Sequence, residues 1–236
     1  MSDHEIVLYS LFGCLIIVTL VYVWNIKGLV ITWLQYLFKP EPSNQQLYRV
    51  GSAQQNTVIM FHGFGSSCER FMDVYYEWFT ENFSRMLCFE YPRPALDHWL
   101  KTFYKTTYRQ AKDSNGIILL YGFSLGGWFA LHAAQYIAKH DPNNKHRIRV
   151  IAIAPMTHWR NFNPQENNIP KKNYVMDSNY GDTTNWQVFA STEDEVFKFD
   201  DIKKTYEGVA SINEVRGGHR SLNIRMDLAI KQALDK

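Results

Sequence analysis

A serine with the surroundings of a catalytic nucleophile lies in the run Gly-Phe-Ser-Leu-Gly-Gly at residues 122–127. The apolar run 116–121 before it predicts a buried strand, and residues 128–140 after it predict a helix. A serine on such a sharp turn takes a strained backbone conformation, and the residues two positions before and after it must be small. Glycine occupies both positions, which favours Ser124 as a nucleophile. The bare pattern also arises by chance in glycine-rich loops, so a base and an acid are needed to support it.

An acid follows the apolar, β-branched segment 186–190, which is typical of a central strand. Three carboxylates come directly after it, at Glu193, Asp194 and Glu195. A carboxylate just past a parallel strand lies at the same sheet edge as Ser124. We favour Asp194, because its short side chain holds an imidazole in register better than a glutamate does. A solvated turn with no catalytic acid is the alternative for this segment.

A histidine follows the last predicted strand, 210–215, after an arginine and two glycines that allow a tight turn. This position makes His219 the expected general base for Ser124. The chain has eight histidines, of which His132 and His140 fit packing or surface roles, and His98 and His158 are the more distant competitors for the base.

An oxyanion hole is expected from the loop His-Gly-Phe-Gly-Ser-Ser at 62–67, which follows the buried strand 57–61. Backbone N–H groups that are fixed near the nucleophile stabilise the charge of a tetrahedral intermediate. We assign this role to the N–H groups of Phe64 and Leu125. An ordinary turn is the alternative for the loop.

Together these motifs resemble the α/β-hydrolase superfamily, over about residues 46–235. The resemblance rests on 62–65, 122–127, 194–196 and 218–219, which occur in the superfamily's chain order. It implies Ser124 as nucleophile, Asp194 as the orienting acid and His219 as base, with Phe64 and Leu125 forming the oxyanion hole. Within the superfamily, the chain is most similar to small lipases, esterases and thioesterases. No metal and no cofactor are implied.

Composition narrows the class of protein further. The 236 residues are 46% hydrophobic, which is enough for one ordinary domain and an appendage. The net charge of +2, without a basic run, argues against a nucleic-acid partner. The three cysteines, Cys14, Cys68 and Cys88, have no metal-ligand spacing, so neither a disulfide framework nor a zinc site is predicted.

Short apolar strands alternate with helical patterns from residue 46 onward. This order predicts an α/β domain over 43–236, with a mostly parallel sheet and helices on both faces. Strands are expected at 47–50, 58–61, 87–90, 117–121, 149–154, 186–190 and 212–215, and helices at 69–80, 95–111, 125–140 and 221–234. The long polar stretch 155–185 is expected to form a lid or cap over the strand ends, with a plain surface loop as the alternative.

The N-terminal segment 1–42 is expected to be a membrane anchor and linker. Residues 6–24 are almost unbroken apolar sequence, long enough to cross a bilayer once as a helix. A cleaved signal peptide is one alternative, but the segment lacks a basic start and a cleavage site after it. A buried helix of a soluble domain is the other, but such a helix usually keeps a polar stripe. Residues 28–38 favour an interfacial or re-entrant helix, so the bilayer contact would extend over 6–38. Pro40 and Pro42 then end the helix.

The expected orientation follows from the charges that flank this segment. Asp3 and Glu5 precede it, whereas Lys27 and Lys39 follow it, so the positive-inside rule places the hydrolase domain in the cytoplasm. The sequence therefore predicts a membrane-anchored serine hydrolase that cleaves an ester or thioester of a lipophilic acyl group, carried by a small molecule or a lipidated protein. An acyltransferase, a peptidase and a non-catalytic membrane-tethered binding module are the alternatives.

Overall fold

The chain divides into two units, Met1–Pro42 and Ser43–Lys236. The computed structural model describes part of the second unit: residues 56–63, 66–90, 104–113, 115–157 and 176–235 in full, and 45–49 and 97–103 by their backbone. The predicted anchor, linker and interfacial helix lie outside these residues and stay predictions. Among the described residues, no helix is both long enough and apolar enough to span a bilayer.

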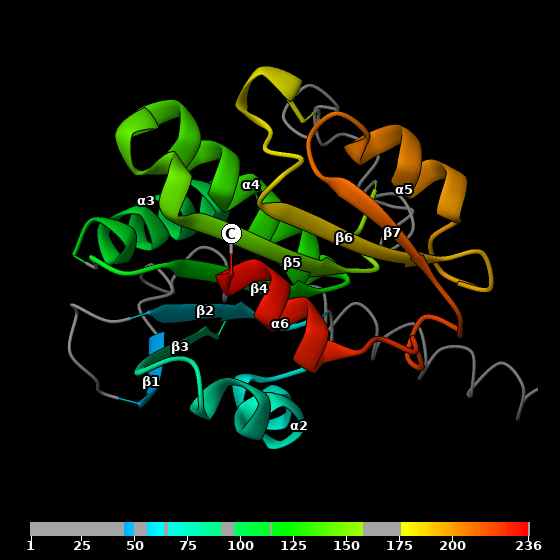
Figure 1. The fold of residues 1–236 in the computed structure, drawn as a ribbon, viewed down its shortest axis with the longest axis horizontal. Helices are drawn as coiled ribbons and strands as arrows, with labels where there is room; N and C mark the ends of the chain where they lie inside the picture. Colours follow the sequence, from blue (N-terminus) through cyan, green and yellow to red (C-terminus); the bar gives the residue numbers. More distant parts are fainter. Residues whose placement is uncertain are drawn as a thin grey trace, which may run out of the picture. The chain divides into compact units, whose positions relative to one another are not determined.

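A seven-stranded sheet in the order β1-β3-β2-β4-β5-β6-β7 forms the centre of the domain (Figure 1). Its strands are β1 (Gln45–Arg49), β2 (Thr57–Phe61), β3 (Arg85–Phe89), β4 (Ile118–Phe123), β5 (Ile148–Ile153), β6 (Trp186–Ser191) and β7 (Ser211–Val215). The edge strand β1 pairs antiparallel with β3, and all other neighbours pair in parallel. This confirms the predicted mostly parallel sheet, and it gathers the carboxyl ends of β2 to β7 along one edge.

Helices cover both faces of the sheet, as the sequence predicts. One face packs against α2 (Cys68–Thr80) and α6 (Met226–Leu234), and the other against α3 (Asp97–Asp113), α4 (Leu125–His140) and α5 (Phe199–Tyr206) (Figure 1). Along β2, Val58 and Met60 join the first apolar cluster, whereas Ile59 and Phe61 join the second. Successive side chains of a strand point to opposite faces. A strand covered on both sides is therefore apolar throughout, which explains the continuous runs in the sequence.

Two α-helices differ most from the sequence predictions. Helix α5 was not predicted; its buried residues Ile202 and Tyr206, four positions apart, make a stripe too short to distinguish from a loop. Helix α6 begins at Met226 rather than at residue 221.

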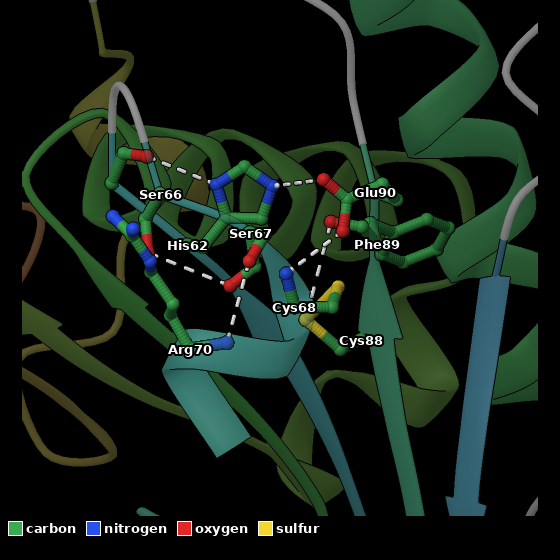
Figure 2. Close-up of a disulfide and its surroundings, with 9 residues drawn as sticks. His62, Ser66, Ser67, Cys68, Arg70, Cys88, Phe89 and Glu90 are labelled. Atoms are coloured by element: carbon green, nitrogen blue, oxygen red, sulfur yellow. Dashed lines mark hydrogen bonds and ion pairs between the residues drawn. A yellow bond between two sulfur atoms is a disulfide. The ribbon is translucent and has the colours of Figure 1, made fainter. Parts of the chain in front are cut away.

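A disulfide joins Cys68, the first residue of α2, to Cys88 in β3, with 5.8 Å between the Cα atoms (Figure 2). The expectation that the cysteines form no disulfide was therefore wrong. The two cysteines are 20 residues apart, and this spacing matches no motif that would predict their pairing. They meet because β3 pairs in parallel beside β2, and α2 starts shortly after β2 ends.

The core side chain His132, on α4, makes folding depend on pH. Burial lowers the pKa of His132 to about 3, and its ring packs against Trp128 with 4.4 Å between the centroids. The unfolded chain binds a proton at an ordinary pKa of about 6.5, whereas the folded chain stays neutral. Folding stability is therefore lost as the pH falls below 6.5, and the loss levels off near the folded value.

We expect His132 to lower the free energy of unfolding by about 2 kcal/mol when the pH falls from 7.5 to 5. The measurement is urea unfolding of wild type and His132→Leu at both pH values in the same detergent. The wild type should lose about 2 kcal/mol more than the variant over this interval. Equal losses in the two proteins would contradict a neutral buried imidazole.

Candidate active site

The nucleophile candidate Ser124 lies between β4 and α4 with the strained backbone that its motif predicts. Its φ of 55° and ψ of −118° fall outside the regions that non-glycine residues prefer. Its backbone is fixed on both sides, because its N–H donates to Ile153 O at 2.8 Å and its carbonyl accepts from Met156 N at 3.1 Å. The turn thereby aims the side chain at the carboxyl edge of the sheet.

The flanking glycines leave no room for a larger residue. A Cβ atom on Gly122 would lie 2.1 Å from Gly126 O, and one on Gly126 would lie 1.9 Å from Phe61 O. These approaches confirm the requirement for small residues on both sides of the serine. They also show that the end of β2 lies directly against the first turn of α4.

The base candidate His219 contacts both other members of the predicted triad. Its Nε2 lies 3.1 Å from Ser124 Oγ, and its Nδ1 lies 2.8 Å from Asp194 Oδ2. The ring also packs against Phe123 and Phe197, with centroid distances of 5.1 and 5.3 Å. The His219 side chain is 7% exposed, so the imidazole is largely shielded from solvent between its two partners.

The acid candidate Asp194 is a carboxylate with every oxygen engaged. Oδ1 accepts hydrogen bonds from Val196 N at 2.7 Å and Phe197 N at 2.9 Å, while Oδ2 faces His219. Burial raises the pKa of Asp194, but the hydrogen bonds from His219 and the two backbone N–H groups outweigh it, so the pKa lies below its ordinary value. The carboxylate therefore stays charged while it orients the imidazole.

The neighbouring glutamates have a positioning contact that the sequence did not reveal. Glu195 Oε2 accepts from the backbone N–H of His219 at 2.8 Å, and Glu193 Oε2 accepts from Gly217 N at 2.9 Å. These bonds tie the histidine loop to the turn after β6. The sequence offered Glu193 and Glu195 only as competitors of Asp194, because a backbone contact leaves no trace in residue spacing.

The predicted oxyanion hole is described in part. Leu125 is the first residue of α4, and the first N–H groups of an α-helix have no intrahelical acceptor. Its N–H therefore suits the assigned role beside Ser124. Phe64 lies outside the described residues, so its role stays a prediction. Gly63, just before it, lies beside Phe123 at the end of β4, since a Cβ atom on Gly63 would lie 3.0 Å from Phe123 Cδ1.

None of the described histidines other than His219 is placed to act as the base, and most of the predicted lid lies outside the described residues. His132 is buried on α4, and His140 is exposed and bonded through Nδ1 to Tyr136 O, so both have packing or surface roles. His158 and the side chain of His98 lie outside the described residues, as does most of the predicted lid, 158–175. The lid stays a prediction.

Similar folds occur among solved structures of esterases and lipases. Est1E from Butyrivibrio proteoclasticus with ferulic acid bound is 17% identical; the match covers 81% of this chain and 92% of that one, with a TM-score of 0.54. Thermogutta terrifontis esterase 2, phosphoramylated by tabun, is 12% identical, with coverages of 81% and 85% and a TM-score of 0.54. The monoacylglycerol lipase of Paleococcus ferrophilus is 14% identical, with coverages of 75% and 90% and a TM-score of 0.52.

The chain has the α/β-hydrolase fold. No protein-family model and no curated protein sequence matches it. At identities this low, the similarity establishes the fold, and the activity must be argued from the site.

Proposed function

We propose that this protein is a membrane-anchored serine hydrolase that cleaves an ester or thioester of a lipophilic acyl group. One observation carries the proposal: hydrogen bonds run without a break from Asp194 through His219 to Ser124, at the carboxyl edge of a parallel sheet. Nucleophile, base and orienting acid in mutual contact are what acyl transfer by a serine requires.

The geometry supports a definite sequence of proton transfers. With its Nδ1–H donated to Asp194, His219 presents the Nε2 lone pair to the Ser124 hydroxyl. His219 takes the hydroxyl proton as Oγ attacks the carbonyl carbon, and the oxyanion is stabilised by Leu125 N–H and, in our proposal, Phe64 N–H. His219 then protonates the leaving group, and the acyl-enzyme forms. A water activated by the same base releases the acid.

Three observations favour a lipophilic ester over other acyl donors. The structural neighbours include an esterase with ferulic acid bound and a monoacylglycerol lipase. The apolar segment 6–24 would hold the enzyme at a bilayer, where lipid substrates have a high effective concentration. Among the described residues, the exposed large apolar side chains all lie on α2 and α6, which cover one face of the sheet; they are Val74, Tyr76, Trp78 and Leu228. Exposed apolar side chains on these two helices suit contact with lipid.

The test uses the detergent-solubilised full chain, a fluorophosphonate probe and p-nitrophenyl esters of increasing acyl length. We expect covalent labelling and hydrolysis that favours the longer chains, both absent in Ser124→Ala. An amide series and a competing alcohol acceptor, with product analysis, separate a peptidase and an acyltransferase from a hydrolase. Folded wild type that neither reacts with the probe nor hydrolyses any ester would overturn the proposal.

A further inference from the structure

Four side chains of the types that bind metal ions lie near the carboxyl ends of β2 and β3, and none of them belongs to the triad. They are His62, Cys68, Cys88 and Glu90 (Figure 2). The parallel register pairs Phe61 with Phe89, so His62 and Glu90 are the next residues along the two strands. The disulfide brings Cys68 and Cys88 to the same place.

The donor atoms are close to the spacing of a tetrahedral site. The ligand atoms of His62, Cys68 and Glu90 lie within 4.8 Å of one another, and His62 Nε2 lies 3.5 Å from Glu90 Oε1. Zinc bonds of about 2.0–2.3 Å place tetrahedral ligand atoms about 3.3–3.8 Å apart. The imidazole and the carboxylate already meet this spacing, and Cys68 Sγ lies within 4.8 Å of both. Cys88 Sγ is bonded to Cys68 Sγ, so the two sulfurs must separate on reduction before both can bind the ion.

Hydrogen bonds orient the imidazole of His62 and the carboxylate of Glu90 toward each other. His62 Nδ1 donates to Gly63 O at 2.9 Å, and Nε2 faces Glu90 Oε1 at 3.5 Å. When the ring is neutral with its proton on Nδ1, Nε2 has the lone pair that a metal ion binds. Metal-binding histidines commonly donate their second ring N–H to a carbonyl in this way. Glu90 Oε2 accepts from Cys68 N at 2.8 Å, which leaves Oε1 toward the ring (Figure 2).

The four side chains differ in their exposure to solvent. His62 is 2% exposed, and both cysteines are fully buried, whereas the Glu90 side chain is 31% exposed. Of the four side chains, Glu90 is therefore the one that an ion from solvent would reach first.

We propose that reduction of the Cys68–Cys88 disulfide creates a zinc site from these four side chains. A thiol reductant supplies two electrons and two protons: the S–S bond breaks, two S–H groups form, and the reductant becomes a disulfide. On binding Zn²⁺, each cysteine releases its proton to solvent and binds as a thiolate, while neutral His62 and ionised Glu90 complete a two-sulfur, nitrogen and oxygen set.

The disulfide and the zinc ion are alternative cross-links between the same two elements. Both tie the start of α2 to β3, and each stabilises a fold by linking distant residues. The cytoplasmic placement predicted from the sequence would keep the thiols reduced, which favours the zinc form. Oxidising conditions favour the disulfide.

The test is cobalt uptake by the full chain in detergent, before and after reduction with dithiothreitol and its anaerobic removal. Tetrahedral Co²⁺ bound to thiolates gives near-ultraviolet charge-transfer bands and strong visible bands. We expect one equivalent to bind to the reduced protein, to be displaced by Zn²⁺, and to be absent from the oxidised protein. A reduced wild type without these bands, or an oxidised one that binds equally, would overturn the proposal.

Variants locate the site. Cys14→Ser is the matched control and should bind like wild type. Cys88→Ser should weaken binding at least about 100-fold and reduce the charge-transfer intensity, and Glu90→Gln should weaken binding while the sulfur bands remain. Circular dichroism checks that each variant is folded. Unchanged binding in Cys88→Ser, or loss of the bands in Cys14→Ser alone, would also contradict the assignment.

Discussion

Replacing Ser124 with alanine should lower kcat for ester hydrolysis about 10⁵- to 10⁶-fold. The variant keeps the turn, the fold and the oxyanion donors, but it lacks the oxygen that attacks the carbonyl carbon. Because Ser124 is 3% exposed and its Oγ contacts His219, the substitution removes one buried hydroxyl and little packing. We therefore expect KM to change far less than kcat.

The measurement is steady-state kinetics with a p-nitrophenyl ester, together with thermal unfolding of both proteins. Ser84→Ala is the matched control, since Ser84 lies just before the amino end of β3, at the opposite edge of the sheet. The control should keep near-normal kcat. If Ser124→Ala retained more than about one hundredth of wild-type kcat while folded, the hydroxyl would not be the nucleophile.

Replacing Asp194 with asparagine should lower kcat about 10⁴-fold. The carboxylate accepts the Nδ1–H of His219 at 2.8 Å and stabilises the imidazolium that forms during catalysis. An amide can instead donate to Nδ1, which favours the tautomer whose Nε2 carries a proton and cannot accept one from Ser124. Glu193→Gln and Glu195→Gln are the matched controls, and each should cost at most about 10-fold, because a glutamine oxygen still accepts a backbone N–H.

The pH dependence of this site has a definite sign. The pKa of Asp194 in the folded chain is lowered, so its stabilising contribution is present above the unfolded value of about 3.9 and is lost as the pH falls through the folded value. Protonation of Asp194 therefore does not account for loss of activity between pH 5 and 7.

The comparison of the three variants also identifies the acid. Near-normal turnover of Asp194→Asn, with a large loss in Glu193→Gln or Glu195→Gln, would assign the role to the glutamate whose variant lost activity.

Most of the fold could be predicted from local patterns in the sequence. The boundaries of the seven strands were predicted within two residues, because strands covered on both faces are continuous apolar runs bounded by turns. The turn at Ser124 was also predicted, because a side chain at position 122 or 126 would clash with the backbone and the sequence has glycine at both. Helix α5 escaped prediction, because two buried residues are too few to establish a helical period.

The sequence by itself determined the α/β architecture and the chain order of serine, acid and histidine, because both depend on residue types at short spacing. Only the tertiary structure decided what those residues contact. Parallel pairing of β4, β5, β6 and β7 places Ser124, Asp194 and His219 within hydrogen-bond distance, although 95 positions separate the serine from the histidine. Pairing of β2 with β3 likewise joins Cys68 to Cys88 and sets His62 against Glu90. Such contacts depend on which strands become neighbours, and no local pattern of residues encodes that choice.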